Sequence, residues 1–222
     1  MNFEEAMEKA GRNRMYESDY LPEFFVLWDN VTREQLANFR SALNKARRES
    51  DMQRYLQANP FLLIQHLGGG NGRWVIPQTR LGAEHVPDFI IGDRHSFGFE
   101  WQVVEIESPS AMVFTKSGDP SKILNHAIRQ ITDWRSWLRR NQEYASRRRE
   151  QNGLGLVDIG SDVKGLIIIG RRDAIAPSTN ERRRQLCSDL RIDIHSYDWL
   201  VGTLQGRLEA LEKRRRDFLT SQ

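Results

Sequence analysis

Three acidic side chains stand at the ends of two short strand-like segments of this sequence. Asp88 opens the apolar segment 88–92, and Glu105 and Glu107 close the segment 101–107. Because side chains alternate between the two faces of a strand, Glu105 and Glu107 point to the same face. If the two segments pair as a hairpin, Asp88 falls beside this pair and the carboxylates share one small volume.

Carboxylates held this close together have a definite chemical consequence. Like charges repel, so at least one of the three acids resists ionisation unless a cation sits among them. Clusters of carboxylate oxygens suit Mg²⁺ or Mn²⁺ better than zinc. The acids therefore indicate a site for a hard metal ion at a sheet edge, and the alternative at this point is a polar strand end in solvent.

Length and composition describe an ordinary globular chain. The 222 residues suffice for one domain with a substantial core, and 39% apolar with 28% charged residues excludes a disordered protein. Cys187 is the only cysteine, which excludes an internal disulfide and fits a reducing, cytoplasmic setting. We expect no membrane partner, because the sequence has neither a signal-peptide core nor an apolar run of spanning length. Clustered arginines and a pI of about 9.2 allow a nucleic-acid partner.

The periodicity of apolar residues predicts one α/β domain with a mixed sheet and helices on both sides. Thr32 and Gln35 resemble a capping box, Asn59-Pro60 stops a helix, and Asp119-Pro120 resembles a helix start. The expected helices cover approximately 32–48, 49–58, 120–138, 178–190 and 198–219, and the expected strands approximately 73–80, 87–92, 97–107, 163–170 and 192–194.

The segment before this domain, residues 1–45, is predicted to be a helical and extended region for packing or oligomerisation. Phe3, Ala6 and Met7 favour a short amphipathic helix. Residues 21–28 form an apolar patch that either straps over the domain's own core or packs on a partner subunit. The strap is the favoured interpretation.

Two polar residues of the long helix can approach the acids. Gln130 lies on the helix's apolar stripe, so its amide needs a partner in a semi-buried place. It either caps a nearby backbone group or holds a metal-bound water. His126 lies one turn earlier and is the one histidine expected near the site; the others are scattered without metal-ligand spacing.

The sequence also resembles a known family. The order of elements, with Pro-Asp on the second strand and an acid pair on the third, resembles the PD-(D/E)XK nuclease superfamily and, more closely, the catalytic domain of Shedu anti-phage proteins. The resemblance covers roughly residues 45–205. The matching segments are Tyr55-Leu56-Gln57-Ala58-Asn59-Pro60, Val86-Pro87-Asp88-Phe89, Val104-Glu105-Ile106-Glu107-Ser108-Pro109, Ala127-Ile128-Arg129-Gln130-Ile131, Leu166-Ile167-Ile168-Ile169-Gly170-Arg171 and Ser196-Tyr197-Asp198-Trp199-Leu200.

This resemblance implies a restriction-endonuclease-like core over residues 46–222 that hydrolyses double-stranded DNA in phage defence with Mg²⁺ or Mn²⁺. It further implies a homo-oligomer, a dimer or a tetramer. By position, the metal ligands would be Asp88, Glu105 and Glu49, and the catalytic residues Asp88, Glu105, Glu107 and Gln130. Phosphates would be held by some of Lys116, Arg129, Arg171 and Arg172.

One position departs from the family pattern. Glu107 occupies the place that usually holds a lysine, which would help to orient the attacking water. Some restriction endonucleases carry glutamate there, so an endonuclease or nickase is the first hypothesis, with Lys116 as a candidate for the missing cation. The alternative is a nucleic-acid-binding module with a degenerate site that serves as a structural subunit. An RNA-processing nuclease is a third hypothesis.

Overall fold

The fold is built on a five-stranded mixed sheet in the described part of the chain. The structure is a computed structural model that describes residue 5, residue 9 and residues 20–28, 31–68 and 71–220. The strands stand in sequence order: β1 (Gly72–Pro77), β2 (Phe89–His95), β3 (Gly98–Ile106), β4 (Lys164–Ile168) and β5 (Ile192–His195). β1, β2 and β3 are antiparallel, whereas β3, β4 and β5 are parallel, which confirms the predicted mixed α/β sheet.

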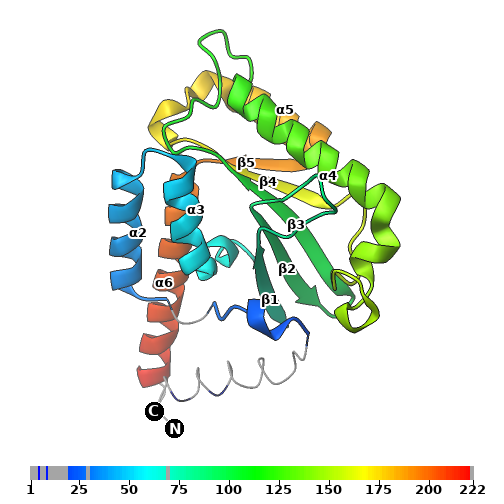
Figure 1. Cartoon of the computed structure of the whole chain (residues 1–222). Coiled ribbons are helices and arrows are strands. Elements are labelled where there is room, and N and C mark those ends of the chain that lie inside the picture. The colour runs from blue at the N-terminus through cyan, green and yellow to red at the C-terminus, as the bar shows by residue number, and fades with distance from the viewer. Residues whose placement is uncertain (1–4, 6–8, 10–19, 29–30, 69–70, 221–222) are drawn as a thin grey trace.

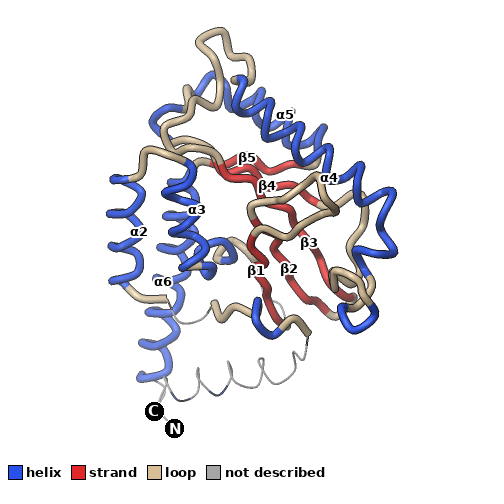
Figure 2. The backbone as a smooth tube through the Cα atoms, in the orientation of Figure 1, coloured by secondary structure: helices blue, strands red, loops and turns tan. Residues whose placement is uncertain are grey.

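Helices cover both faces of the sheet (Figure 1). The α-helices are α2 (Arg33–Lys45), α3 (Glu49–Ala58), α4 (Lys122–Ser146), α5 (Asn180–Leu190) and α6 (Tyr197–Thr220). Short 3-10 turns are η1 (Pro22–Phe24), η2 (Pro60–Ile64), η3 (Arg149–Gln151), η4 (Arg172–Ala174) and η5 (Pro177–Thr179). In Figure 2, α2, α3 and α6 stand on one side of the red strands, and α4 and α5 on the other.

Each face of the sheet has its own hydrophobic core. Val103 and Ile167 face α4, where they pack with Leu124, Ile131 and other apolar residues of that helix. Their strand neighbours face the opposite way, toward the core that α2, α3 and α6 close. A strand covered on both sides is apolar on both faces, which explains the apolar run Leu166-Ile167-Ile168 in β4.

The helices before the sheet begin and end where local chemistry requires. Thr32 and Gln35 form the predicted capping box, each side chain binding the other's backbone N–H. α3 spans Glu49–Ala58 as predicted, and Asn59-Pro60 ends it. The helix expected around Phe3, Ala6 and Met7 lies outside the described residues.

Residues 20–28 lie against the sheet of their own chain. The Val26 N–H donates to the Arg73 carbonyl over 2.9 Å, and the Trp74 Nε1–H donates to the Tyr20 carbonyl over 2.7 Å. Val26 and Trp28 belong to the same core as α2, α3 and α6. The described part of the segment is therefore a strap over its own domain, and the division at residue 45 stays a prediction.

The predicted start of the long helix was wrong. α4 begins at Lys122, and its N-cap is Ser121, whose hydroxyl accepts the Leu124 N–H over 3.1 Å. Asp119 instead closes a turn before the helix, where its carbonyl accepts the Thr115 N–H over 2.8 Å. Among the described residues, no helix combines the length and apolarity needed to span a membrane.

A buried ion pair joins the first two strands. Arg73 and Asp93 are direct cross-strand partners, and their Nε and Oδ1 atoms are 3.6 Å apart. The Arg73 side chain is fully buried and stacks 4.2 Å from the centre of the Trp28 ring. The same pair therefore ties the β1–β2 hairpin to the strap.

Candidate metal-binding carboxylate site

The β2–β3 pairing brings Asp88 and Glu105 to the same level of the sheet. Phe89 is paired with Val104, so Asp88, one residue before β2, falls opposite Glu105. An Asp88 Oδ2 atom accepts the Ile106 N–H over 2.9 Å, which fixes this carboxylate against the end of β3. The juxtaposition predicted from a hairpin is confirmed.

Glu105 and Glu107 stand where the parallel strands end. The Glu107 N–H continues the parallel ladder by donating to the Ile168 carbonyl over 2.9 Å. Both side chains are largely buried, with 6% and 8% of each residue exposed. The carboxyl ends of parallel strands are the usual location of binding sites in open α/β sheets.

Glu49 adds a fourth carboxylate from a third segment. It is the first residue of α3, and partial burial raises its pKa. Its charge also acts on Asp88, Glu105 and Glu107. The helix acid proposed from the family resemblance therefore lies within electrostatic reach of the strand acids.

The four carboxylates oppose one another's ionisation. Burial, together with the charges of Asp88, Glu107 and Glu49, raises the pKa of Glu105 well above its usual range. Burial also raises the pKa of Asp88. Burial, with Glu49 and Asp88, raises the pKa of Glu107 to about 7. Acids in this state gain strongly from a cation, because it would favour the ionised form of each.

In the part of the chain that the structure describes, the buried oxygen atoms without a hydrogen-bond partner include Glu105 Oε2 and Gln130 Oε1 at this site. Gln130 projects from α4 toward Glu105, and its side chain interacts with that carboxyl and so opposes the rise in its pKa. His126, one turn earlier on α4, places its Nδ1 atom 3.9 Å from Glu107 Oε1. Sequence reasoning named both residues, and the structure places both beside the strand acids.

The donor chemistry fits a hard divalent cation. Carboxylate and amide oxygens are the ligands that Mg²⁺ and Mn²⁺ prefer, and unpartnered buried oxygens favour an added positive charge. As the side chains stand, however, no three His, Cys, Asp or Glu residues in the described ranges form a ready set for a metal ion. A bound cation would therefore have to draw the carboxylates into a closer arrangement.

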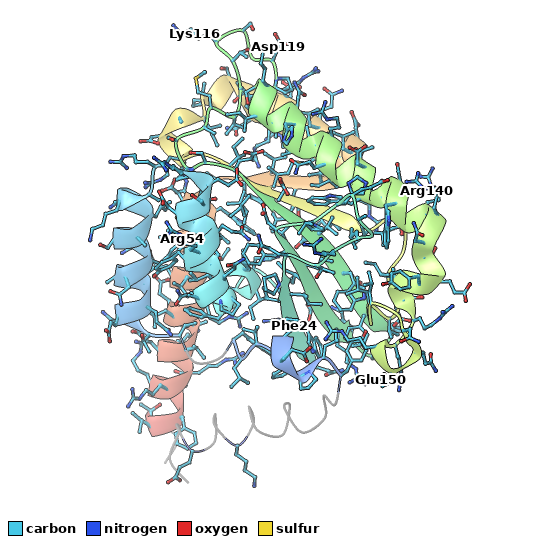
Figure 3. The ribbon with its side chains drawn as sticks, viewed as in Figure 1. Phe24, Arg54, Lys116, Asp119, Arg140 and Glu150 are labelled. Carbon is cyan, nitrogen blue, oxygen red and sulfur yellow. The ribbon has the colours of Figure 1, made fainter. Side chains whose placement is uncertain are left out.

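The four predicted DNA-binding residues fall into two groups. Lys116 and Arg129 are exposed, and Lys116 lies at the tip of the loop between β3 and α4 (Figure 3). Arg171 instead forms an ion pair with Asp198, with Nη2 and Oδ1 2.9 Å apart, and the Arg172 N–H donates to the same carboxylate over 2.7 Å. Asp198 thus fixes both Arg171 and Arg172 just after the end of β4.

Tyr197 is a site residue that sequence reasoning did not single out. Its hydroxyl donates to the Glu107 carbonyl over 2.8 Å in a fully buried setting. Burial raises the pKa of Tyr197 well above its usual value, so the hydroxyl keeps its proton. The only sequence signal was its place in the segment 196–200, because a contact across 90 positions leaves no local pattern.

Replacing Tyr197 with phenylalanine is expected to lower the free energy of unfolding by about 1–2 kcal/mol, because the Glu107 carbonyl would stay buried without a donor. Thermal unfolding should show a melting temperature a few degrees lower. Tyr144→Phe is the control, since Tyr144 is 42% exposed. Equal melting temperatures for the two variants would contradict a structural role for the Tyr197 hydroxyl.

The fold and the site together define a class: a mixed α/β protein with a carboxylate cluster at the carboxyl ends of its parallel strands. The family model described as "Shedu protein SduA, C-terminal" matches residues 46–201, and the chain belongs to this family. Membership suggests a role in anti-phage defence. The search of curated proteins gives no match to this chain.

Proposed function

We propose that the protein is a metal-dependent DNA endonuclease or nickase that acts in anti-phage defence. The observation that supports this best is the convergence of Asp88, Glu105, Glu107 and Glu49, with a buried carboxylate oxygen of Glu105 left unpartnered. A structural site would pair these acids with arginine or lysine, whereas a catalytic site keeps them available for an ion.

In this proposal, the fold is a restriction-endonuclease-like core and its acids divide the work. Asp88, Glu105 and Glu49 would hold Mg²⁺ or Mn²⁺, which when bound lowers the pKa of water and offsets charge on the phosphate. Glu107, whose pKa is about 7, is suited to take a proton from the attacking water near neutral pH. Gln130 would orient the Glu105 carboxyl through its amide group.

The proposed substrate is double-stranded DNA, held through its phosphates. Lys116 is exposed at the tip of the loop between β3 and α4, and Arg129 is exposed on α4. Arg171 and Arg172 follow the end of β4. We also propose that the protein works in the cytoplasm as a homo-oligomer, a dimer or a tetramer. Sedimentation velocity of the purified chain measures the oligomeric state directly.

One observation favours a second candidate, a DNA-binding module without catalysis. Glu107 stands where the resemblance expects lysine, and a basic group that faces it in the described chain is His126, whose Nδ1 atom is 3.9 Å from Glu107 Oε1. Lys116 lies at an exposed loop tip, and no ion pair joins it to the four acids within the described residues. A site without its cation would bind DNA and leave it intact.

Incubation of the purified protein with supercoiled plasmid separates these candidates. The nuclease proposal expects relaxed or linear plasmid with Mg²⁺ or Mn²⁺ and none with EDTA. Binding in a gel-shift experiment without cleavage in either metal would overturn it in favour of the binding module. RNA offered in the same assay tests the third hypothesis, and selective RNA cleavage would replace DNA as the substrate.

A further inference from the structure

Hydrogen bonds fix the backbone of the turn between α2 and α3, although the arginine side chains of this turn are exposed. An Asp51 Oδ2 atom accepts the backbone N–H groups of both Arg47 and Arg48, each over 3.1 Å. Both arginine side chains lie on the surface. The backbone is therefore ordered while the side chains face solvent, which is the arrangement that a charged recognition surface needs.

A second set of hydrogen bonds joins this turn to the carboxylate site. The hydroxyls of Ser108 and Ser110 both donate to the Arg47 carbonyl, over 2.9 and 3.0 Å. Ser108 directly follows Glu107, so the turn lies beside the exit of β3. Glu49, on the other side of Arg48, interacts electrostatically with the strand acids.

Asn44 links the same turn to the end of β4. The Arg47 guanidinium donates to the Asn44 carbonyl over 2.9 Å, and the Arg171 guanidinium donates to Asn44 Oδ1 over 3.2 Å. Two arginines that are far apart in sequence thus converge on one asparagine. The α2–α3 turn and the end of β4 together form one basic ledge, made of Arg47, Arg48, Arg171 and Arg172.

Within this ledge the arginines are not equivalent. The Arg171 guanidinium is largely occupied by Asp198, which accepts three of its hydrogen bonds at 2.9–3.2 Å. Arg48 forms no ion pair in the described chain, and the Arg47 guanidinium binds only backbone carbonyls. The Arg172 guanidinium donates to the Asp198 carbonyl over 3.4 Å, and its charge also acts on the Asp198 carboxylate. The guanidinium groups of the turn are therefore the part of the ledge that Asp198 does not offset, and they are available to an outside anion.

We propose that Arg47 and Arg48 bind adjacent phosphate groups of a DNA strand and so place the next phosphate over the carboxylates. This inference rests on the proposed function for its choice of DNA as the ligand. Lysine and arginine contacts to phosphate position a nucleic acid without reading its sequence. The ledge therefore sets where the strand lies and leaves base preference to other contacts.

The test measures binding separately from cleavage. In an Asp88→Asn background, the affinity for a short fluorescent DNA duplex is measured across a salt series with EDTA. Each phosphate contact contributes about 0.9 to the slope of log K against log salt. The Arg47→Ala/Arg48→Ala variant should thus reduce the slope by about 1.8, whereas Arg139→Ala/Arg140→Ala, with the same change in charge at the far end of α4 (Figure 3), should leave it near the parent value.

A second variant separates positioning from net charge. Ser108→Ala/Ser110→Ala keeps every charge but releases the turn from the site, and it should weaken duplex binding while the protein stays folded. Equal slopes for the Arg47/Arg48 and Arg139/Arg140 variants would overturn the inference, as would an absence of duplex binding by the parent. If the expected differences in salt slope are found but the wild-type protein does not cleave plasmid, only the nuclease proposal is overturned.

Discussion

Glu105→Gln is expected to reduce plasmid nicking by roughly 100-fold or more while making the metal-free protein more stable. The loss of activity follows if a metal ion is held by Glu105, because the removal of a ligand forfeits several kcal/mol of transition-state stabilisation and each 1.36 kcal/mol is a factor of ten in rate. The measurement is the initial rate of nicking with Mg²⁺ or Mn²⁺.

The gain in stability has an electrostatic origin. Burial and three neighbouring acids raise the pKa of Glu105 in the folded protein, so unfolding releases its proton near neutral pH and is favoured by that release. Glutamine has almost the same shape but does not titrate. We expect the free energy of unfolding to rise by about 2 kcal/mol at pH 7.5, or approximately 4–8 °C in melting temperature.

The pH dependence of this difference has a fixed sign. Below the unfolded-state pKa of about 4.3, Glu105 is protonated in both states, so the wild type and the variant should unfold at similar temperatures. As the pH rises above that value, the unfolded wild type ionises first, and the advantage of the variant should grow. Thermal unfolding between acidic and mildly alkaline pH in EDTA measures this trend.

A control substitution on the same strand tests whether the changes in nicking and stability are specific to Glu105. Glu100→Gln changes an exposed acid of the same strand and should alter neither nicking nor melting temperature appreciably. Added Mn²⁺ should raise the melting temperature of the wild type and of Glu100→Gln, but raise that of Glu105→Gln much less. A Glu105→Gln variant that nicks plasmid at the wild-type rate would remove this residue from the catalytic set.

The second large effect is expected at the buried ion pair of β1 and β2. Asp93→Ala leaves the Arg73 guanidinium, which has no exposed surface, without its carboxylate. Breaking a buried ion pair by removing one partner costs about 3–5 kcal/mol, so the melting temperature should fall by roughly 10 °C. Asp88 directly precedes β2, so the site should lose its order together with this hairpin.

Two comparisons make that prediction sharp. Asp193→Ala breaks the surface pair with Lys164, whose side chains are 34% and 49% exposed, and should cost less than about 1 kcal/mol. The double variant Arg73→Met/Asp93→Leu removes both charges and should be more stable than Asp93→Ala alone. If Arg73→Met/Asp93→Leu is instead less stable than Asp93→Ala, the explanation by a buried charge that has lost its partner is wrong.

Several structural features that depend on residues close together in the chain were predicted correctly from the sequence. Alternation along two strands placed Asp88 beside Glu105, and the Thr32–Gln35 spacing located the start of α2. The start of α4 was misplaced because Asp119-Pro120 has the composition of a cap. In the structure, hydrogen bonds to Thr115 and Ser117 hold Asp119 in a turn, and Ser121 serves as the cap instead.

Partners far apart in the chain were beyond prediction. Arg171 was predicted to be one of the phosphate ligands, yet it pairs with Asp198, 27 positions later. The hydrogen bond from Tyr197 to the Glu107 carbonyl and those from Ser108 and Ser110 to Arg47 likewise depend on the packing of separate elements. No single-sequence pattern records such pairs, because only the folded chain brings them together.

The core beneath α6 bears on how a minimal fragment should be chosen. Residues 46–201 match the family model, but Phe39 and Leu43 on one side of that interval, and Leu204 and Leu208 on the other, fill the same apolar layer as Met52 and Leu56. A fragment trimmed to the matched interval would expose that layer to water and invite aggregation. Expression work should therefore retain the strap and α2 at one end and α6 through at least Leu208 at the other.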